Sequence, residues 1–226
     1  MGLWNNVTNK AWNDQDKDVV YAMDQMATAG AKGPNGCPEG YCMGLASIWM
    51  RGLWVPKDYP YDANAVEYHG TDWNAVAVQK VYDSEMTSAV ARQSQTGIAG
   101  DTYVPIRNAF KRAGLNLNHG RSQFTTQGGI EGTGIYSVIA QQGDGVFLIA
   151  LSGPPAKPGG PATAHAFAIA NLGDQWWRLF DGNYGHFCMK GNTVFKKWLD
   201  YYISGSGTSY RFTYSGTWLS ACAAPA

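Results

Sequence analysis

The sequence has no long apolar run and few cysteines, and each absence excludes a class of protein. A helix that crosses a bilayer needs about 18 or more consecutive apolar residues, and no run of that length occurs here. We therefore expect no membrane span. The four cysteines, at positions 37, 42, 188 and 222, are too few for a disulfide-scaffolded fold in 226 residues. One disulfide bond is compatible with this number, and we expect it to leave Cys42 free.

The chain also lacks an excess of charge of either sign. Its 17 Lys and Arg residues equal its 17 Asp and Glu residues, and no basic cluster runs along any segment. Such clusters bind nucleic acids and anionic membranes, so we expect neither as a partner. The C-x4-C spacing of Cys37 and Cys42, with His119 further along, matches no zinc-site pattern. We expect no metal and no other cofactor.

The first residues lack the order of a secretory signal peptide, in which a basic region precedes an apolar one. Gly2 would permit myristoylation, but Asn6 stands where that motif usually has Ser or Thr. The polar composition of residues 1–14 predicts a flexible N-terminal segment. Secretion through a signal peptide is therefore not expected.

What the sequence does contain is enough apolar material for one core. Hydrophobic residues make up 45% of the chain, and 28 Gly and 9 Trp indicate many tight turns and an aromatic-rich interior. A chain of 226 residues is short for two independent domains. We predict a single domain over residues 1–226.

The stretch over residues 163–187 offers a histidine and a carboxylate on two adjacent strand-like segments. His165 opens an apolar run in which small and large side chains alternate, as they do in a buried strand. Gly173 and Asp174 are a hairpin turn signal, and the return segment ends at Asp181. The hairpin predicts that His165 and Asp181 are neighbours. A carboxylate beside an imidazole fixes its tautomer and stabilises the imidazolium, which suits a histidine that takes a proton from a nucleophile.

Cys42 is the candidate nucleophile. It follows a glycine- and proline-rich loop over residues 29–40 and stands in the first turn of a predicted helix, which carries Leu45, Ile48 and Trp49 at helical spacing. The unsatisfied amides at a helix start stabilise a thiolate. The alternative is that Cys42 is a small core residue, which is the commoner role of a cysteine on a helix. This segment alone does not decide between the two.

The remaining pattern predicts an α+β fold. Besides the Cys42 helix, we predict helices over residues 15–29, 73–95, 103–113, 135–142 and 193–203. Strands are predicted over residues 115–118, 146–152, 164–172, 175–181 and 208–214. We expect the last four strands to form an antiparallel sheet, with the Cys42 helix packed against it.

Three segments of the chain together resemble a known family. YCMGLASIWM, TAHAFAIA and LFDGNYGHF are similar to the motifs of the YopT/AvrPphB family of bacterial effector cysteine proteases, and the resemblance covers roughly residues 35–203. Cys42 lies 123 positions before His165, which lies 16 positions before Asp181, and both intervals are similar to those of the family. The third segment is the most specific of the three.

The resemblance implies a papain-like fold, in which a helical half carries the cysteine and an antiparallel sheet carries the histidine and the aspartate. It implies a catalytic triad of Cys42 as nucleophile, His165 as acid and base, and Asp181 as the residue that orients the imidazole. The best candidate for a side-chain donor to the oxyanion is Asn35, which would act with the Cys42 backbone amide.

The same resemblance implies a biological setting. Proteins of this family are effectors or toxins, so we expect delivery by a specialised bacterial secretion system into the cytoplasm of a target cell. The expected partner is a protein or peptide substrate in that cell. A cognate chaperone or immunity protein is a further candidate partner.

Two other functions are compatible with the sequence. A peptidoglycan amidase or endopeptidase, or a transglutaminase-type enzyme, would use the same Cys-His-acid arrangement on a different substrate. A non-enzymatic binding module would instead present the abundant Trp and Tyr residues as a surface for a glycan or a protein.

Four further residues near the His165 hairpin have predicted roles. Asn183 is expected to shape the turn after Asp181. His186 is expected to be a structural or surface residue. Trp176 and Trp177 must point to opposite faces of one strand, so we expect one in the core and the other as a wall of the site.

Overall fold

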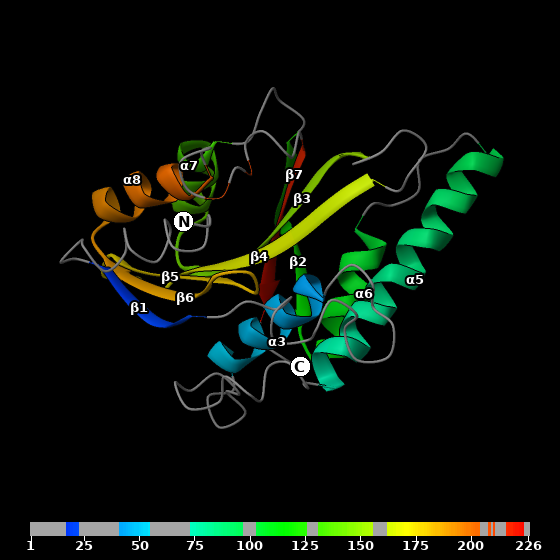
Figure 1. Ribbon diagram of the computed structural model, residues 1–226, viewed down its shortest axis with the longest axis horizontal. Helices are drawn as coiled ribbons and strands as arrows, with labels where there is room; N and C mark the ends of the chain where they lie inside the picture. Colours follow the sequence, from blue (N-terminus) through cyan, green and yellow to red (C-terminus); the bar gives the residue numbers. More distant parts are fainter. Residues whose placement is uncertain are drawn as a thin grey trace.

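The computed structural model describes residues 17–22, 41–54, 73–96, 103–125, 131–155, 162–203, 208, 210 and 216–223, and shows helices packed on both faces of one sheet (Figure 1). The described helices are α3 (Cys42–Trp54), α5 (Trp73–Thr96), α6 (Val104–Ala113), α7 (Gly132–Gln142) and α8 (Asn192–Ile203). The described strands are β1 (Lys17–Ala22), β2 (Asn116–Thr125), β3 (Gly145–Pro155), β4 (Ala162–Asn171), β5 (Trp176–Asp181), β6 (Gly185–Lys190) and β7 (Gly216–Ala223). Among these described helices, none is long and apolar enough to cross a membrane.

The sheet has seven strands in the order β1-β6-β5-β4-β3-β7-β2. Every pairing between these strands is antiparallel, as predicted. Strands β3, β4, β5 and β6 follow one another along the chain and pair in that order, which is the natural result of hairpin connections. The histidine and the aspartate of the predicted site therefore belong to two adjacent central strands, β4 and β5.

Side-chain size alternates along β4 and divides the core into two clusters. Ala166, Ala168 and Ala170 face the cluster built around α3, α5 and α6. Phe167 and Ile169 face the cluster built around α7 and α8. Successive side chains of a strand point to opposite faces, so one short sequence forms part of both clusters.

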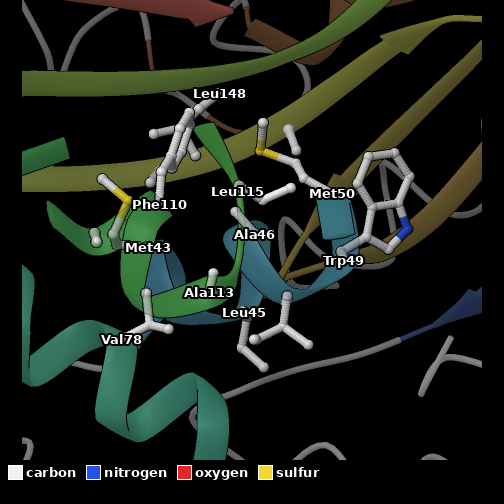
Figure 2. Packing of buried hydrophobic residues seen from close by; sticks show 14 of the residues in the cluster. Met43, Leu45, Ala46, Trp49, Met50, Val78, Phe110, Ala113, Leu115 and Leu148 are labelled. Atoms are coloured by element: carbon white, nitrogen blue, oxygen red, sulfur yellow. The ribbon is translucent and has the colours of Figure 1, made fainter. Parts of the chain in front are cut away.

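Helix α3 is buried along most of its length between the sheet and two other helices (Figure 2). Met43, Ala46 and Trp49 are at most 1% exposed and contact residues from α5, α6 and β3. The Trp49 ring stacks on Phe180 of β5 with 5.7 Å between ring centroids. Burial of one such large apolar side chain contributes about 1.5–3 kcal/mol relative to exposure, so α3 is held rigidly behind the site.

Glycine permits two close helix contacts. A Cβ atom at Gly44 of α3 would lie 1.9 Å from the carbonyl oxygen of Ala75 in α5. A Cβ atom at Gly132 of α7 would lie 2.4 Å from backbone atoms of Leu199 in α8. Both distances are far inside van der Waals contact, so these helix pairs can approach so closely only without a side chain at these positions.

Most of the predicted helices and strands are confirmed. The Cys42 helix, the long helix after residue 72, the helix ending before Gly114 and the helix over residues 193–203 all match the structure within a few residues. Gly114 adopts φ 76° at the end of α6, where a left-handed residue terminates the helix. The hairpin of β4 and β5 also lies where it was predicted.

Several predictions were wrong. Residues 17–22, predicted within a helix over 15–29, form strand β1 on the edge of the sheet, paired with β6. In the closing strand predicted at 208–214, Thr208 is instead in a turn and Tyr210 is helical, and residues 211–214 lie outside the described residues. Strand β7 occupies Gly216–Ala223. Strand β2 extends well beyond the predicted 115–118, and strand β6 was not predicted.

Candidate active site

Cys42 is the first residue of helix α3. The carbonyl oxygen of Tyr41 accepts the first backbone hydrogen bond of the helix, from the Leu45 amide at 2.9 Å. Tyr41 has no short side-chain acceptor with which to cap the free amides that follow, and another helix supplies the cap instead. The Gly44 amide donates to Oε1 of Gln79 in α5 at 3.2 Å. The first turn of α3 is thereby fixed from outside the helix.

Gln79 is itself oriented by its own helix. Its Nε2 atom donates to Oδ1 of Asp83 at 2.8 Å, which leaves Oε1 to face α3. Gln79 is only 6% exposed. A buried amide with both ends bonded has one favoured orientation, so this contact sets the place of α3 relative to α5.

His165 and Asp181 form a buried pair on β4 and β5. The Nε2 atom of His165 lies 2.9 Å from Oδ2 of Asp181, and the two residues are 5% and 0% exposed. The two strands are paired from Ala168 opposite Phe180 to Asn171 opposite Trp177. Asp181 is the last residue of β5 and His165 lies on the same face of β4, so the hairpin brings the two side chains together at one end of the strand pair.

The carboxylate of Asp181 has three further hydrogen-bond donors, and its backbone carbonyl has one. The Tyr202 hydroxyl of α8 donates to Oδ2 at 2.5 Å, and the Tyr210 hydroxyl donates to the same atom at 2.9 Å. The backbone amide of Asn183 donates to Oδ1 at 2.8 Å. The amide of Tyr184 donates to the Asp181 carbonyl oxygen at 3.0 Å. Asn183 thus shapes the turn after Asp181, as predicted.

The electrostatics of the pair favour its charged form. Burial alone would lower the pKa of His165, but the charge and hydrogen bond of Asp181, together with Cys42, raise it to about 10. Burial would raise the pKa of Asp181, but the charge and hydrogen bond of His165, helped by Tyr202 and the Asn183 amide, lower it. The imidazolium and the carboxylate stabilise each other in a site from which water is excluded.

Cys42 is a free, partly buried thiol that interacts with this pair. It contributes to the raised pKa of His165 through a hydrogen bond and through charge. Burial raises the pKa of Tyr82 in α5, and the neighbouring Cys42 adds to that effect. Cys42 therefore lies near both the imidazole of His165 and Tyr82 of α5. Cys188, which is also partly buried, is on β6.

The structure brings together three of the four predicted site residues. Cys42, His165 and Asp181 interact as described, whereas Asn35 and the loop around it lie outside the described residues. Within the described part of the chain, no three His, Cys, Asp or Glu side chains are grouped to hold a metal ion.

His186 and Trp176 do not belong to the site. His186 is fully buried on the opposite face of the sheet, where its ring meets Trp49 edge-on at 5.3 Å between centroids. Burial, with the charge of Arg178, lowers its pKa to about 3, so His186 is a neutral core residue. Trp177 is in the core, as expected of one tryptophan. Trp176 is 39% exposed at the start of β5, the far end from Asp181, so its predicted role as a wall of the site is wrong.

Two site residues were missed from the sequence. Tyr202 stands on the buried face of a correctly predicted helix, with Trp198 and Leu199, and this position could have indicated an inward-facing hydroxyl. Tyr210 was assigned to a strand, whereas the structure gives it a helical conformation, so its approach to His165 had no signal in the pattern.

The chain is similar to known proteins in sequence pattern and in fold. Residues 19–216 match the family model Peptidase C58, described as Yersinia/Haemophilus virulence surface antigen. The crystal structure of the Pseudomonas avirulence protein AvrPphB is similar with a TM-score of 0.58 and 16% identity, over 90% of this chain and 96% of that chain. PatoxP, a cysteine protease-like domain of the Photorhabdus asymbiotica toxin PaTox, has a TM-score of 0.49 and 11% identity, over 96% of this chain and 56% of that chain. No curated protein sequence matches.

These matches test the predicted fold and family. The likeness to AvrPphB confirms the α+β, papain-like fold, with helices packed on an antiparallel sheet. The family match confirms the predicted resemblance to the YopT/AvrPphB-like proteins, and it supports cysteine protease activity. Since the match spans most of the sequence, the chain belongs to the Yersinia/Haemophilus virulence surface antigen family of peptidases.

Proposed function

We propose that this protein is an effector cysteine protease that cleaves a protein of a target cell, with Cys42, His165 and Asp181 as its catalytic triad. The observation that carries the proposal is the buried His165–Asp181 pair at 2.9 Å with the Cys42 thiol interacting with the same imidazole. Cys42 also stands at the start of α3, and the electric field of a helix N-terminus favours a thiolate.

Each residue has a role that its environment supports. The thiolate sulfur of Cys42 attacks the carbonyl carbon of the scissile peptide bond, with the imidazolium of His165 as its counter-ion. His165 then gives its proton to the leaving amine, and the acyl group remains on Cys42. His165 next takes a proton from water, which attacks the acyl group and releases the second product. Asp181 touches no substrate and holds the imidazole in the required orientation and charge.

The developing oxyanion requires donors near Cys42. In the first turn of a helix the leading amides have no partner within the helix, and the Gly44 amide is already occupied by Gln79. The Cys42 amide is the donor we assign, because it is the closest to the bond-forming atom. Asn35, in the loop before α3, is our candidate for the second donor.

The family and the predicted setting extend the proposal to location and partners. We propose delivery by a specialised secretion system into the cytoplasm of a target cell, where the substrate is a protein or peptide. A cognate chaperone or immunity protein is a further proposed partner. The family match supports peptide hydrolysis over the amidase and transglutaminase alternatives, which keep the same three residues.

The test is a search for new peptide termini in a target-cell proteome. The proteome is incubated with the wild-type protein or with Cys42→Ala, and the termini are read by mass spectrometry. We expect one or a few cleavage sites that appear only with the wild type. Equal termini in both samples, from variants with the same thermal unfolding, would reject the nucleophile and with it the proposed protease.

A further inference from the structure

We propose that Tyr202 and Tyr210 are positioning residues, whose hydroxyl groups hold Asp181 against His165 in one geometry and close that pair to water. This inference rests on the proposed function, because it assigns roles within the same site. It goes beyond the triad in making the reactivity of Cys42 depend on two residues of the C-terminal part of the chain.

The Tyr210 hydroxyl completes a triangle with the histidine and the aspartate. It lies 2.9 Å from Nε2 of His165 and 2.9 Å from Oδ2 of Asp181, and these two atoms are themselves 2.9 Å apart. A hydroxyl can accept one hydrogen bond and donate another. The Nε2 proton of the imidazolium is therefore shared between the carboxylate and the Tyr210 oxygen, while the Tyr210 proton points to the carboxylate. This arrangement resists rotation of the imidazole.

Tyr202 supplies the second hydroxyl to the same carboxylate oxygen. It donates to Oδ2 at 2.5 Å from a position on α8 that is fully buried. A carboxylate removed from water must receive hydrogen bonds from the protein, or its charged form becomes costly. The two tyrosines, with the Asn183 amide and His165, provide those donors.

Both hydroxyls keep their protons at any pH at which the site would work. Burial raises the pKa of Tyr202 and of Tyr210 well above the ordinary value, and the charge of Asp181 raises each further. Neither tyrosine can become an anion beside the carboxylate, so each remains a donor. This separates them from groups that would take part in proton transfer.

The rings of the two tyrosines add a steric constraint. The Tyr210 ring lies 5.0 Å from the His165 ring, and it meets the Tyr202 ring nearly at a right angle at 5.9 Å. Thr208 links the two residues, because its hydroxyl and its amide both donate to the Tyr202 carbonyl oxygen and its hydroxyl accepts from the Tyr210 amide. Thr208 is thus tied to α8, and Tyr210, bonded to Thr208, has its ring beside the imidazole.

The test measures how fast iodoacetamide alkylates Cys42 from about pH 4 to pH 9 in the full chain, with the modified cysteine identified by peptide mapping. Tyr210→Phe and Tyr202→Phe each remove a hydroxyl and keep the ring. Tyr136→Phe is the matched control, since this partly buried tyrosine of α7 packs on Trp177 and Phe195, away from the pair. Thermal unfolding of every variant is recorded in the same buffer.

We expect the wild type and Tyr136→Phe to be alkylated rapidly in mildly acidic solution, where thiolate persists only as the partner of the imidazolium. In Tyr210→Phe and Tyr202→Phe the rate near pH 5 should fall by about 10- to 100-fold, the size of effect that a misplaced catalytic group produces. The acid limb of the profile should move to higher pH, because Asp181 then takes up a proton more easily. A purely structural role would leave the shape of this profile unchanged.

Three outcomes would overturn the inference. The first is a profile of both tyrosine variants that superimposes on the wild type. The second is a changed profile that appears only together with loss of the folded state, and the third is a profile that Tyr136→Phe changes equally. Failure of the proposed function looks different: Cys42 of the wild type would then be alkylated no faster than Cys188, before any tyrosine is changed.

Discussion

The side chain of Gln79 accepts a hydrogen bond from the backbone of Gly44, so that one helix caps the start of another. Such capping is normally local, from a Ser, Thr, Asp or Asn directly before the helix. Here the acceptor lies 35 positions away along the chain, and the capped helix begins with the proposed nucleophile. The first turn of α3, which begins at Cys42, therefore keeps its helical structure only while α5 is packed against it.

Replacing Gln79 by Met should test this dependence, since Met has a similar shape and no oxygen. We expect a loss of about 1–2 kcal/mol in the free energy of unfolding, because the Gly44 amide is left buried without its acceptor. Alkylation of Cys42 should also slow as the first turn of α3 frays. Urea denaturation and iodoacetamide kinetics measure the two effects. Gln93→Met, at an exposed position of the same helix, should change neither, and equal effects of both substitutions would contradict the capping role.

The close approach of α3 and α5 predicts a strong effect of Gly44→Ala. The added methyl group would overlap the Ala75 carbonyl oxygen at 1.9 Å, so the helices must separate. We expect destabilisation of about 1–3 kcal/mol or more, measured by urea denaturation. Gly134→Ala is the control, because a Cβ atom there meets no atom within 4 Å in helix α7. That variant should be neutral or more stable by up to about 1 kcal/mol, since Ala favours the helix over Gly.

The three proposed catalytic residues should differ in how much their loss costs. Cys42→Ala removes the bond-forming atom and His165→Ala removes the proton carrier, so each should reduce turnover of the mapped substrate to background. Asp181→Asn should retain at least about ten times more activity than His165→Ala, because an amide still orients the ring without stabilising its charge.

Non-additivity provides a second check on the same residues. The double variant Cys42→Ala/His165→Ala should be no worse than Cys42→Ala alone, since groups that act as one unit lose their effect together. The measurement is turnover of the two single variants and the double variant under identical conditions. A double variant that is clearly slower than both single variants would show that the two residues act independently.

The raised pKa of His165 predicts how stability depends on pH. The folded protein holds the proton up to about pH 10, whereas the unfolded chain releases it near 6.5, the ordinary pKa of histidine. The contribution of protonated His165 is therefore fully present below about pH 6.5 and declines as the pH rises towards 10. Urea denaturation at several pH values should show the difference between the wild type and His165→Gln shrinking over this interval. A difference that grows with pH would mean that His165 is neutral in the fold.

Much of the site could be predicted because the hairpin that forms it is local. The turn at Gly173 and the alternation after His165 fix both strands and their register, so the contact with Asp181 follows from the chain itself. The Cys42 helix could be predicted for the same reason. The interaction between Cys42 and His165 joins segments that are distant in the chain. Hydrophobic periodicity cannot predict such a contact, and it was predicted from the resemblance to the family motifs.

The wrong predictions share a physical cause, which is that tertiary contacts decided them. The segment Lys17–Ala22 contains adjacent apolar residues compatible with either a helix or a strand, and its pairing with β6 settles the choice. Strand β6 is short and follows a tight turn after Asp181, so its mixed sequence gave no clear period. The Tyr210 amide donates a hydrogen bond to the Thr208 hydroxyl, and no pattern of hydrophobic residues reveals this contact.

The three alanines of β4 give the site a spacer of fixed thickness. Ala166, Ala168 and Ala170 separate the backbone of the histidine strand from the helix that begins with the proposed nucleophile. A larger residue at any of them would push α3 outward as a rigid rod, since its other faces are already packed. The distance between the Cys42 sulfur and the His165 imidazole thus depends on three alanine methyl groups that take no part in the chemistry. A larger residue at any of these three positions would therefore lower the activity although every proposed catalytic residue is still present.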